Sequence, residues 1–62
     1  MLKFKIGDRI KNKHADQYSY ANINNYTFKI IGIYNNKYEL KANNFIGYRS
    51  IEEIENNFIL IQ

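Results

Sequence analysis

Two Asn-Asn dipeptides constrain this chain more than any other feature, because they divide its most β-prone region into three segments. Asn35-Asn36 and Asn43-Asn44 separate the segments 27–34, 37–42 and 45–49, which are rich in β-branched and aromatic residues. Asparagine tolerates the left-handed backbone conformation that two-residue hairpin loops require. The pattern therefore predicts a three-stranded antiparallel meander.

The two turns also fix a register for this meander. The first turn places Ile33 opposite Tyr38 and Ile31 opposite Leu40, and the second places Ala42 opposite Phe45. Alternation along the strands then predicts two faces. The predicted core face holds Ile31, Ile33, Tyr38, Leu40, Ala42 and Phe45, and the solvent face holds Tyr34, Lys37, Glu39, Lys41, Ile46 and Tyr48. Phe28 and Ile30 are out of phase with Ile31 and Ile33, so we expect a β-bulge near residues 30–32.

The flanking segments add further elements. Phe4 and Ile6 alternate with lysines, which predicts a short strand before a Gly7-Asp8 turn, and extended structure resumes at 9–11. Residues 14–26 fit neither the helical nor the strand period, so we expect a long loop there. Ser50 and Glu53 match a capping box. A short helical turn should begin there and end at Asn56-Asn57, before a last strand over 58–61.

Three phrases of the sequence, "FKIGDRIK", "FKIIGIYNNKYEL" and "RSIEEIENNFILI", follow this order of elements. The chain resembles an SH3-like small β-barrel, the outline that Tudor-like, KOW-like and small phage-encoded barrels share. The resemblance covers nearly the whole chain and implies one all-β domain over residues 1–62, a five-stranded barrel with one short helical turn before the last strand. Such barrels commonly bind ligands between the first long loop and neighbouring loops. We therefore expect a partner-binding patch at Tyr18, Tyr20 and Tyr48.

Composition narrows the classes of function. The chain has 62 residues, no cysteine and one histidine, which is too little for a thiolate or zinc site. It offers neither a catalytic constellation nor a glycine-rich phosphate loop, so we expect no enzyme, no cofactor and no metal. No targeting segment and no membrane-spanning run is visible, which favours a cytoplasmic protein.

The net charge and its distribution bear on the kind of partner. The net charge is +3 with a pI near 9.3. Residues 1–13 carry most of the positive charge, and Glu52, Glu53 and Glu55 make the C-terminal part acidic. Residues with A/T-rich codons dominate the composition, which favours an origin in a low-G+C bacterium or its phages and mobile elements, and part of the lysine content follows from that bias.

Three functional hypotheses remain from the sequence. The first is a protein-binding module, an accessory or inhibitor protein of a phage or mobile element that occupies a surface of a larger host protein. The alternative is direct binding of DNA or RNA, with tyrosines stacking on bases and a phosphate backbone along the basic residues Lys3, Lys5, Arg9, Lys11, Lys13, Lys29 and Lys41. Of these, the candidate site residues are Lys11, Lys13, Lys29 and Lys41. The third is a structural component such as a small homodimer.

Overall fold

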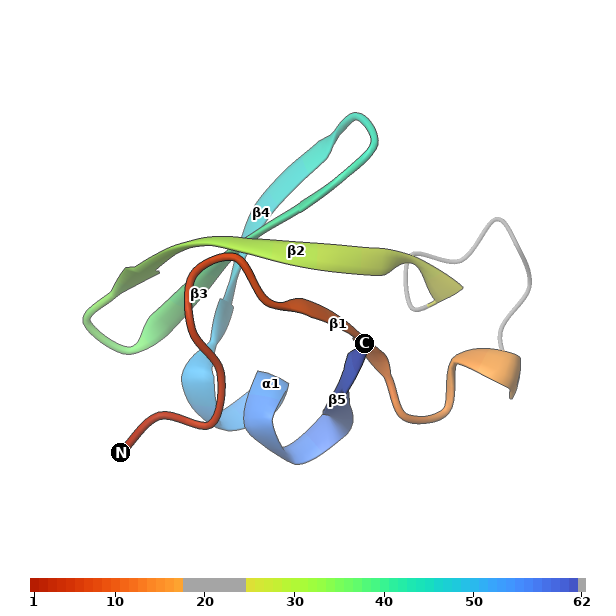
Figure 1. The fold of residues 1–62 in the computed structure, drawn as a ribbon, viewed down its shortest axis with the longest axis horizontal. Coiled ribbons are helices and arrows are strands. Elements are labelled where there is room, and N and C mark those ends of the chain that lie inside the picture. Colours follow the sequence, from red (N-terminus) through yellow and green to blue (C-terminus); the bar gives the residue numbers. More distant parts are fainter. Residues whose placement is uncertain (18–24, 62) are drawn as a thin grey trace.

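The computed structural model describes residues 1–17 and 25–61, and in them five antiparallel strands form one sheet with a single α-helix (Figure 1). The elements are β1 (Arg9–Asn12), a 3-10 helix (Ala15–Gln17), β2 (Thr27–Tyr34), β3 (Lys37–Ala42), β4 (Phe45–Ser50), α1 (Ile51–Asn57) and β5 (Phe58–Ile61). The strand order is β4-β3-β2-β1-β5. The predicted all-β class, the helical turn before the last strand and that strand itself are confirmed.

The sheet is open at both ends. β4 and β5 are its outermost strands and do not pair with each other. The five-stranded antiparallel sheet that the resemblance implied is therefore present, whereas closure into a barrel is not shown.

Both Asn-Asn turns form as predicted. Asn35 and Asn43, the first residue of each turn, have φ angles of 47° and 51°. Asparagine occupies this left-handed region at a lower cost than other residues that carry a Cβ. The turns join β2 to β3 and β3 to β4, and each produces the expected register nearby.

A β-bulge in β2 corrects the rest of the predicted register. The pairing shifts between Ile30 and Gly32, so that Ile30, not Ile31, lies opposite Leu40. The bulge itself was predicted, but its consequence for Ile31 was not. Phe28 and Ile30 enter the core, whereas Ile31 is half-buried outside the core cluster. An extra residue in one strand reverses the face on which the following side chains lie.

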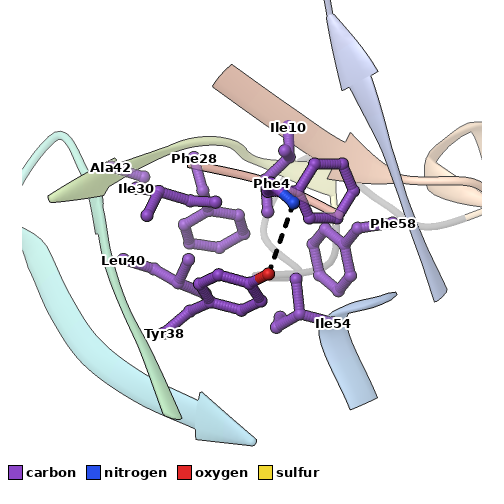
Figure 2. Close-up of a cluster of buried hydrophobic side chains, with 9 residues drawn as sticks. All are labelled: Phe4, Ile10, Phe28, Ile30, Tyr38, Leu40, Ala42, Ile54 and Phe58. Carbon is purple, nitrogen blue, oxygen red and sulfur yellow. Dashed lines mark hydrogen bonds between the residues drawn. The ribbon is translucent and has the colours of Figure 1, made fainter. Parts of the chain in front are cut away.

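The core lies on one face of the sheet, called here the inner face (Figure 2). Its buried members are Phe4, Ile10, Phe28, Ile30, Tyr38, Leu40, Ala42, Ile54 and Phe58. Edge-to-face ring contacts, such as Phe28 with Phe58 at 6.1 Å, fill the centre. Ile54 brings α1 against this face, so the opposite, outer face is left to the solvent.

Helix α1 begins where the capping box predicts. The Ser50 hydroxyl accepts a hydrogen bond of 3.1 Å from the backbone N–H of Glu53. The cap satisfies a donor that the first helical turn leaves without an intrahelical partner.

The predicted N-terminal strand around Phe4 and Ile6 is wrong. The first strand begins at Arg9, and the segment before it is irregular. Asp8 folds this segment into a tight turn, because its Oδ2 accepts from the backbone N–H of Lys5 and its own N–H donates to the carbonyl of Lys5. Phe4 is buried, as a strand would also have placed it, but Ile6 is exposed.

Candidate functional site

Three cations form a row across three neighbouring strands on the outer face of the sheet. Arg9 of β1 pairs with Lys29 of β2, and Lys29 pairs with Lys41 of β3. Residues that are paired in this way have Cβ atoms about 5 Å apart on the same face. All three are exposed, and their strand neighbours Ile10, Phe28, Ile30, Leu40 and Ala42 are buried on the inner face. We call Arg9, Lys29 and Lys41 the cation row.

The cation row continues into a wider basic face. Lys11 lies two residues after Arg9 on the same strand, so it points to the same side, and it pairs with Thr27. Within the part of the chain that the structure describes, the one ion pair joins Lys5 to Asp8. The row therefore has no carboxylate partner there. The acidic side chains Glu52 and Glu53 lie on α1, which packs on the inner side.

A surface groove borders the cation row and has a cavity volume of about 650 Å³. The row supplies all three of its cationic lining residues, and Tyr26, Thr27 and Asn43 also line it. Tyr26 is half-buried, with its ring 6.1 Å from that of Phe28, so it is held by the core while it borders the groove. The groove thus combines fixed positive charge with an aromatic side chain.

The other end of the outer face carries two tyrosines and a carboxylate. The rings of Tyr34 and Tyr48 are 6.1 Å apart in an edge arrangement, and both residues are about half exposed. Glu39 pairs with Tyr48 across the strands. It raises the pKa of Tyr34 mainly by accepting a hydrogen bond from its hydroxyl, and it raises the pKa of Tyr48 mainly through its negative charge. Together we call these three residues the phenol cluster.

Gly32 makes room for the phenol cluster. A Cβ atom at this position would lie 2.6 Å from Cε2 of Tyr34 and 2.8 Å from Oε1 of Glu39. Such distances are too short for real contacts, so the Tyr34 ring lies over the sheet only because Gly32 has no side chain. Ile46, which is 57% exposed, connects the phenol cluster to the cation row because it pairs with Lys41.

Tyr38 serves the fold and not this outer face. Its hydroxyl donates to Oε2 of Glu55 at 2.8 Å and accepts from the backbone N–H of Phe4 at 3.4 Å, the second of which Figure 2 shows. Glu55 also accepts from the backbone N–H of Lys3. Burial of the hydroxyl and its hydrogen bond to Glu55 raise the pKa of Tyr38 to about 12. The hydrogen bonds from Lys3 and Tyr38 lower the pKa of Glu55. This network fastens the N-terminal segment over the core.

The structure brings some of the predicted site residues together and not others. Lys29 and Lys41 are adjacent members of the cation row, and Lys11 lies on the same face. Lys13 follows the end of β1, where its backbone N–H donates to the carbonyl of Asn57. Tyr48 lies on the outer face, as predicted. Tyr18 and Tyr20 lie outside the described residues.

Two contributors were not among the candidate site residues, although Arg9 belongs to the wider set of basic residues that the sequence offers for a phosphate backbone. Arg9 completes the row through its pairing with Lys29, and Tyr26 contributes the aromatic wall of the groove. The alternation of charged and apolar residues over 9–12 places Arg9 on the solvent face, but its position opposite Lys29 depends on a pairing between strands that are far apart in the sequence. No signal in the sequence singles out Tyr26 among six tyrosines.

Groups of acidic, histidine or cysteine side chains that could hold a metal ion do not occur within residues 1–17 and 25–61. Over the same residues, no helix has the length and apolar character needed to cross a membrane. Comparison of the chain with protein-family models, curated proteins and solved structures finds no match.

Proposed function

We propose that the outer face of the sheet binds single-stranded nucleic acid without catalysis, with phosphate groups on the cation row. The observation that carries the proposal is the direct cross-strand alignment of Arg9, Lys29 and Lys41. Like charges placed opposite each other in a sheet destabilise it. A bound polyanion would turn this repulsion into attraction and release counterions.

Neither a role in solubility nor protection of a sheet edge explains where the cation row lies. Lysines commonly protect the outer strands of a sheet from pairing with other chains. Lys29, however, lies on β2, the middle strand of five, with a cation on each side. A role in solubility would be met equally well by alternating charges along the row. The alignment at the centre of the sheet favours a ligand that carries regularly spaced negative charge.

The groove favours a single strand over a duplex. Tyr26 lines the groove together with the three cations. An aromatic side chain beside a cationic track can stack on an unpaired base, whereas the bases of a duplex already stack on each other. Such binding tolerates many sequences, because every base offers a π-face.

Fluorescence anisotropy with labelled oligo-dT and oligo-U, and with a duplex of the same length, tests this proposal. We expect both single strands to bind more tightly than the duplex. Lys29→Gln combined with Lys41→Gln should weaken binding at least tenfold. Lys5→Gln, which removes a cation that is ion-paired with Asp8 outside the row, should leave binding within twofold. Equal losses in the row variant and in the control would mean that net charge, not the row, is responsible.

The salt dependence of the binding affinity gives the number of phosphate contacts. If the three cations of the row and Lys11 each neutralise one phosphate, the slope of log affinity against log salt is about −0.7 × 4, or roughly −2.8, for a single strand. The variant that lacks two of these cations should show about −0.7 × 2, or roughly −1.4. A slope that the two substitutions leave unchanged would place the phosphates elsewhere.

A protein partner is a second candidate, favoured by a different observation. Tyr34, Tyr48 and Ile46 are each more than half exposed and lie close together on the outer face. Exposed tyrosines with an apolar neighbour are typical of interface anchors, which can each contribute about 2 kcal/mol or more. On this proposal the chain is a binding module that occupies a surface of a larger protein.

Stability measurements and a pull-down separate anchor tyrosines from core tyrosines. Tyr48→Ala should change the melting temperature little and should remove a partner from nuclease-treated lysate. Tyr38→Ala is the contrast, because Tyr38 is fully buried and its truncation should cost about 3 kcal/mol or more. Retention of the same partner by Tyr48→Ala would remove the phenol cluster from the proposed interface.

The order of the strands also supports the SH3-like resemblance as a proposal. A meander of β2, β3 and β4 is followed by α1 and by β5, which returns to pair with β1. We propose that the chain is a small, open member of the SH3-like outline that presents its outer sheet face to ligands.

A further inference from the structure

Judged from residues 1–17 and 25–61, the β5 edge of the sheet is the less protected of its two edges. β5 contains no charged residue and no proline, and Ile59 and Leu60 are 43% and 48% exposed. At the opposite edge, the guanidinium group of Arg49 donates to the carbonyl of Tyr48 at 2.8 Å and so occupies one acceptor of β4. Uncharged apolar edge strands are templates for pairing with another chain.

The hydrogen-bond pattern shows which groups of β5 face this open edge. The backbone N–H of Lys13 donates to the carbonyl of Asn57. In an antiparallel ladder every second opposed pair exchanges hydrogen bonds, so the bonded pairs further along are Lys11 with Ile59 and Arg9 with Ile61. The N–H and C=O groups of Leu60 therefore point away from β1, toward the edge.

We propose that this edge pairs with β5 of a second copy of the chain, antiparallel and centred on Leu60. In that register the two Leu60 residues exchange both of their backbone hydrogen bonds. Ile59 lies opposite Ile61 of the second copy, and Ile61 opposite its Ile59. The contacts that Leu60, Ile59 and Ile61 make across the seam are then apolar, and the same residues serve both copies, as a two-fold interface requires.

The pairing has a defined geometry and a limited size. A two-fold axis perpendicular to the sheet places the outer faces of both copies on the same side, so the basic faces, each with its cation row, share one surface. Because Arg49 hinders the other edge, assembly ends at the dimer. The seam is short, and interfaces well below the usual 1,200–2,000 Å² are weak, so we expect association only at about 0.1–1 mM.

Sedimentation equilibrium without nucleic acid tests the pairing independently of the proposed ligand. The monomer has a mass of 7.5 kDa, and we expect the mass to approach twice this value at about 1 mM. Leu60→Lys should abolish the increase, and Ile46→Lys, which adds the same charge to the β4 edge, should leave it intact. A wild-type chain that remains monomeric, or association that Ile46→Lys removes instead, would overturn the proposal.

Oxidative cross-linking tests the register. The chain has no cysteine, so a single introduced thiol is unique. L60C places the two sulfur-bearing residues directly opposite, with Cα atoms about 5.5 Å apart, which suits a disulfide. In I59C the two cysteines are offset by two residues, so their Cα atoms are farther apart than the distance of about 7 Å that a disulfide can bridge. We expect L60C to cross-link at least tenfold faster than I59C or I46C, and equal rates would overturn the register.

Discussion

Replacement of Lys29 by glutamine should stabilise the fold while it weakens binding to nucleic acid. Lys29 lies between Arg9 and Lys41, and each of these cations is directly opposite it on the outer face. At about 7 Å in water, two unit charges repel by about 0.6 kcal/mol. Screening at 0.15 M salt reduces this to about 0.25 kcal/mol. Two such neighbours give about 0.5 kcal/mol, or roughly 2–4 °C in melting temperature for a domain of this size.

Thermal melting followed by circular dichroism at two salt concentrations measures this effect. The gain of Lys29→Gln should be present at 0.15 M salt and nearly absent at 1 M, because the Debye length falls to about 3 Å. Lys5→Gln is the matched control, because it removes the same charge but breaks the exposed Lys5–Asp8 ion pair. It should be neutral or slightly destabilising, as surface ion pairs contribute little.

Two results would refute this reasoning. If Lys29→Gln melts below the wild type, the aliphatic stem of Lys29 packs on the sheet to greater effect than its charge repels. If the gain is the same at 1 M salt, it does not come from charge repulsion at all. In either case the cation row would no longer indicate that stability has been given up for binding.

Ser50→Ala should lower the free energy of unfolding by about 1 kcal/mol, or roughly 4–8 °C in melting temperature, because the N-cap of α1 is lost. Asn43→Gly should be tolerated and Asn43→Ala should destabilise by about 1 kcal/mol, because alanine strains at a φ of 51°; chemical denaturation measures both. In an absorbance titration near 295 nm, Tyr38 should be the last of the tyrosines on the described strands to ionise, near pH 12. Because its folded pKa is raised above 10, its contribution is complete below pH 10 and lost as the pH approaches 12. Glu55 has a lowered folded pKa, so its contribution is present above its unfolded value of about 4.5 and lost on acidification; Glu55→Gln should be less acid-sensitive than the wild type in urea melts at pH 7 and pH 3.

The meander was predictable from the sequence because its determinants are local. Each Asn-Asn turn fixes the two strands beside it through a few backbone angles, and the burial of Tyr38 and Leu40 follows from the period of two. The capping box is equally local. The strand expected around Phe4 failed because two apolar residues in alternation are too few to specify a strand. The turn that Asp8 closes on Lys5 also interrupts the extended structure, so that only after the turn, at Gly7 and Asp8, does the backbone bond to Ile30 of β2.

The candidate site was only half predictable, because the cation row depends on a pairing between distant segments. Lys41 lies opposite Lys29 on two strands that one tight turn joins. The alternation of residues in the sequence already predicts Lys41 on the solvent face. Arg9 lies opposite Lys29 only in the observed register of β1 and β2. The segment between these strands is too long for a local turn to fix that register. Hydrophobic burial of Ile10 and Phe28 selects that register, since a shift by one residue would place one of the two on the solvent face. The site is thus a consequence of core packing on the other side of the sheet.

The two proposed ligands concern different halves of one face, and Glu39 separates them. Its carboxylate lies in the phenol cluster, two residues along β3 from Lys41, and it would repel a phosphate there. On the proposed function, a nucleic-acid strand would therefore be directed along the cation row, toward Arg9 and the Tyr26 groove and away from Tyr48. A protein partner at the phenol cluster would meet two tyrosine rings 6.1 Å apart beside the carboxylate of Glu39. Because the cation row and the phenol cluster share no residue, substitutions in one half report on one ligand at a time.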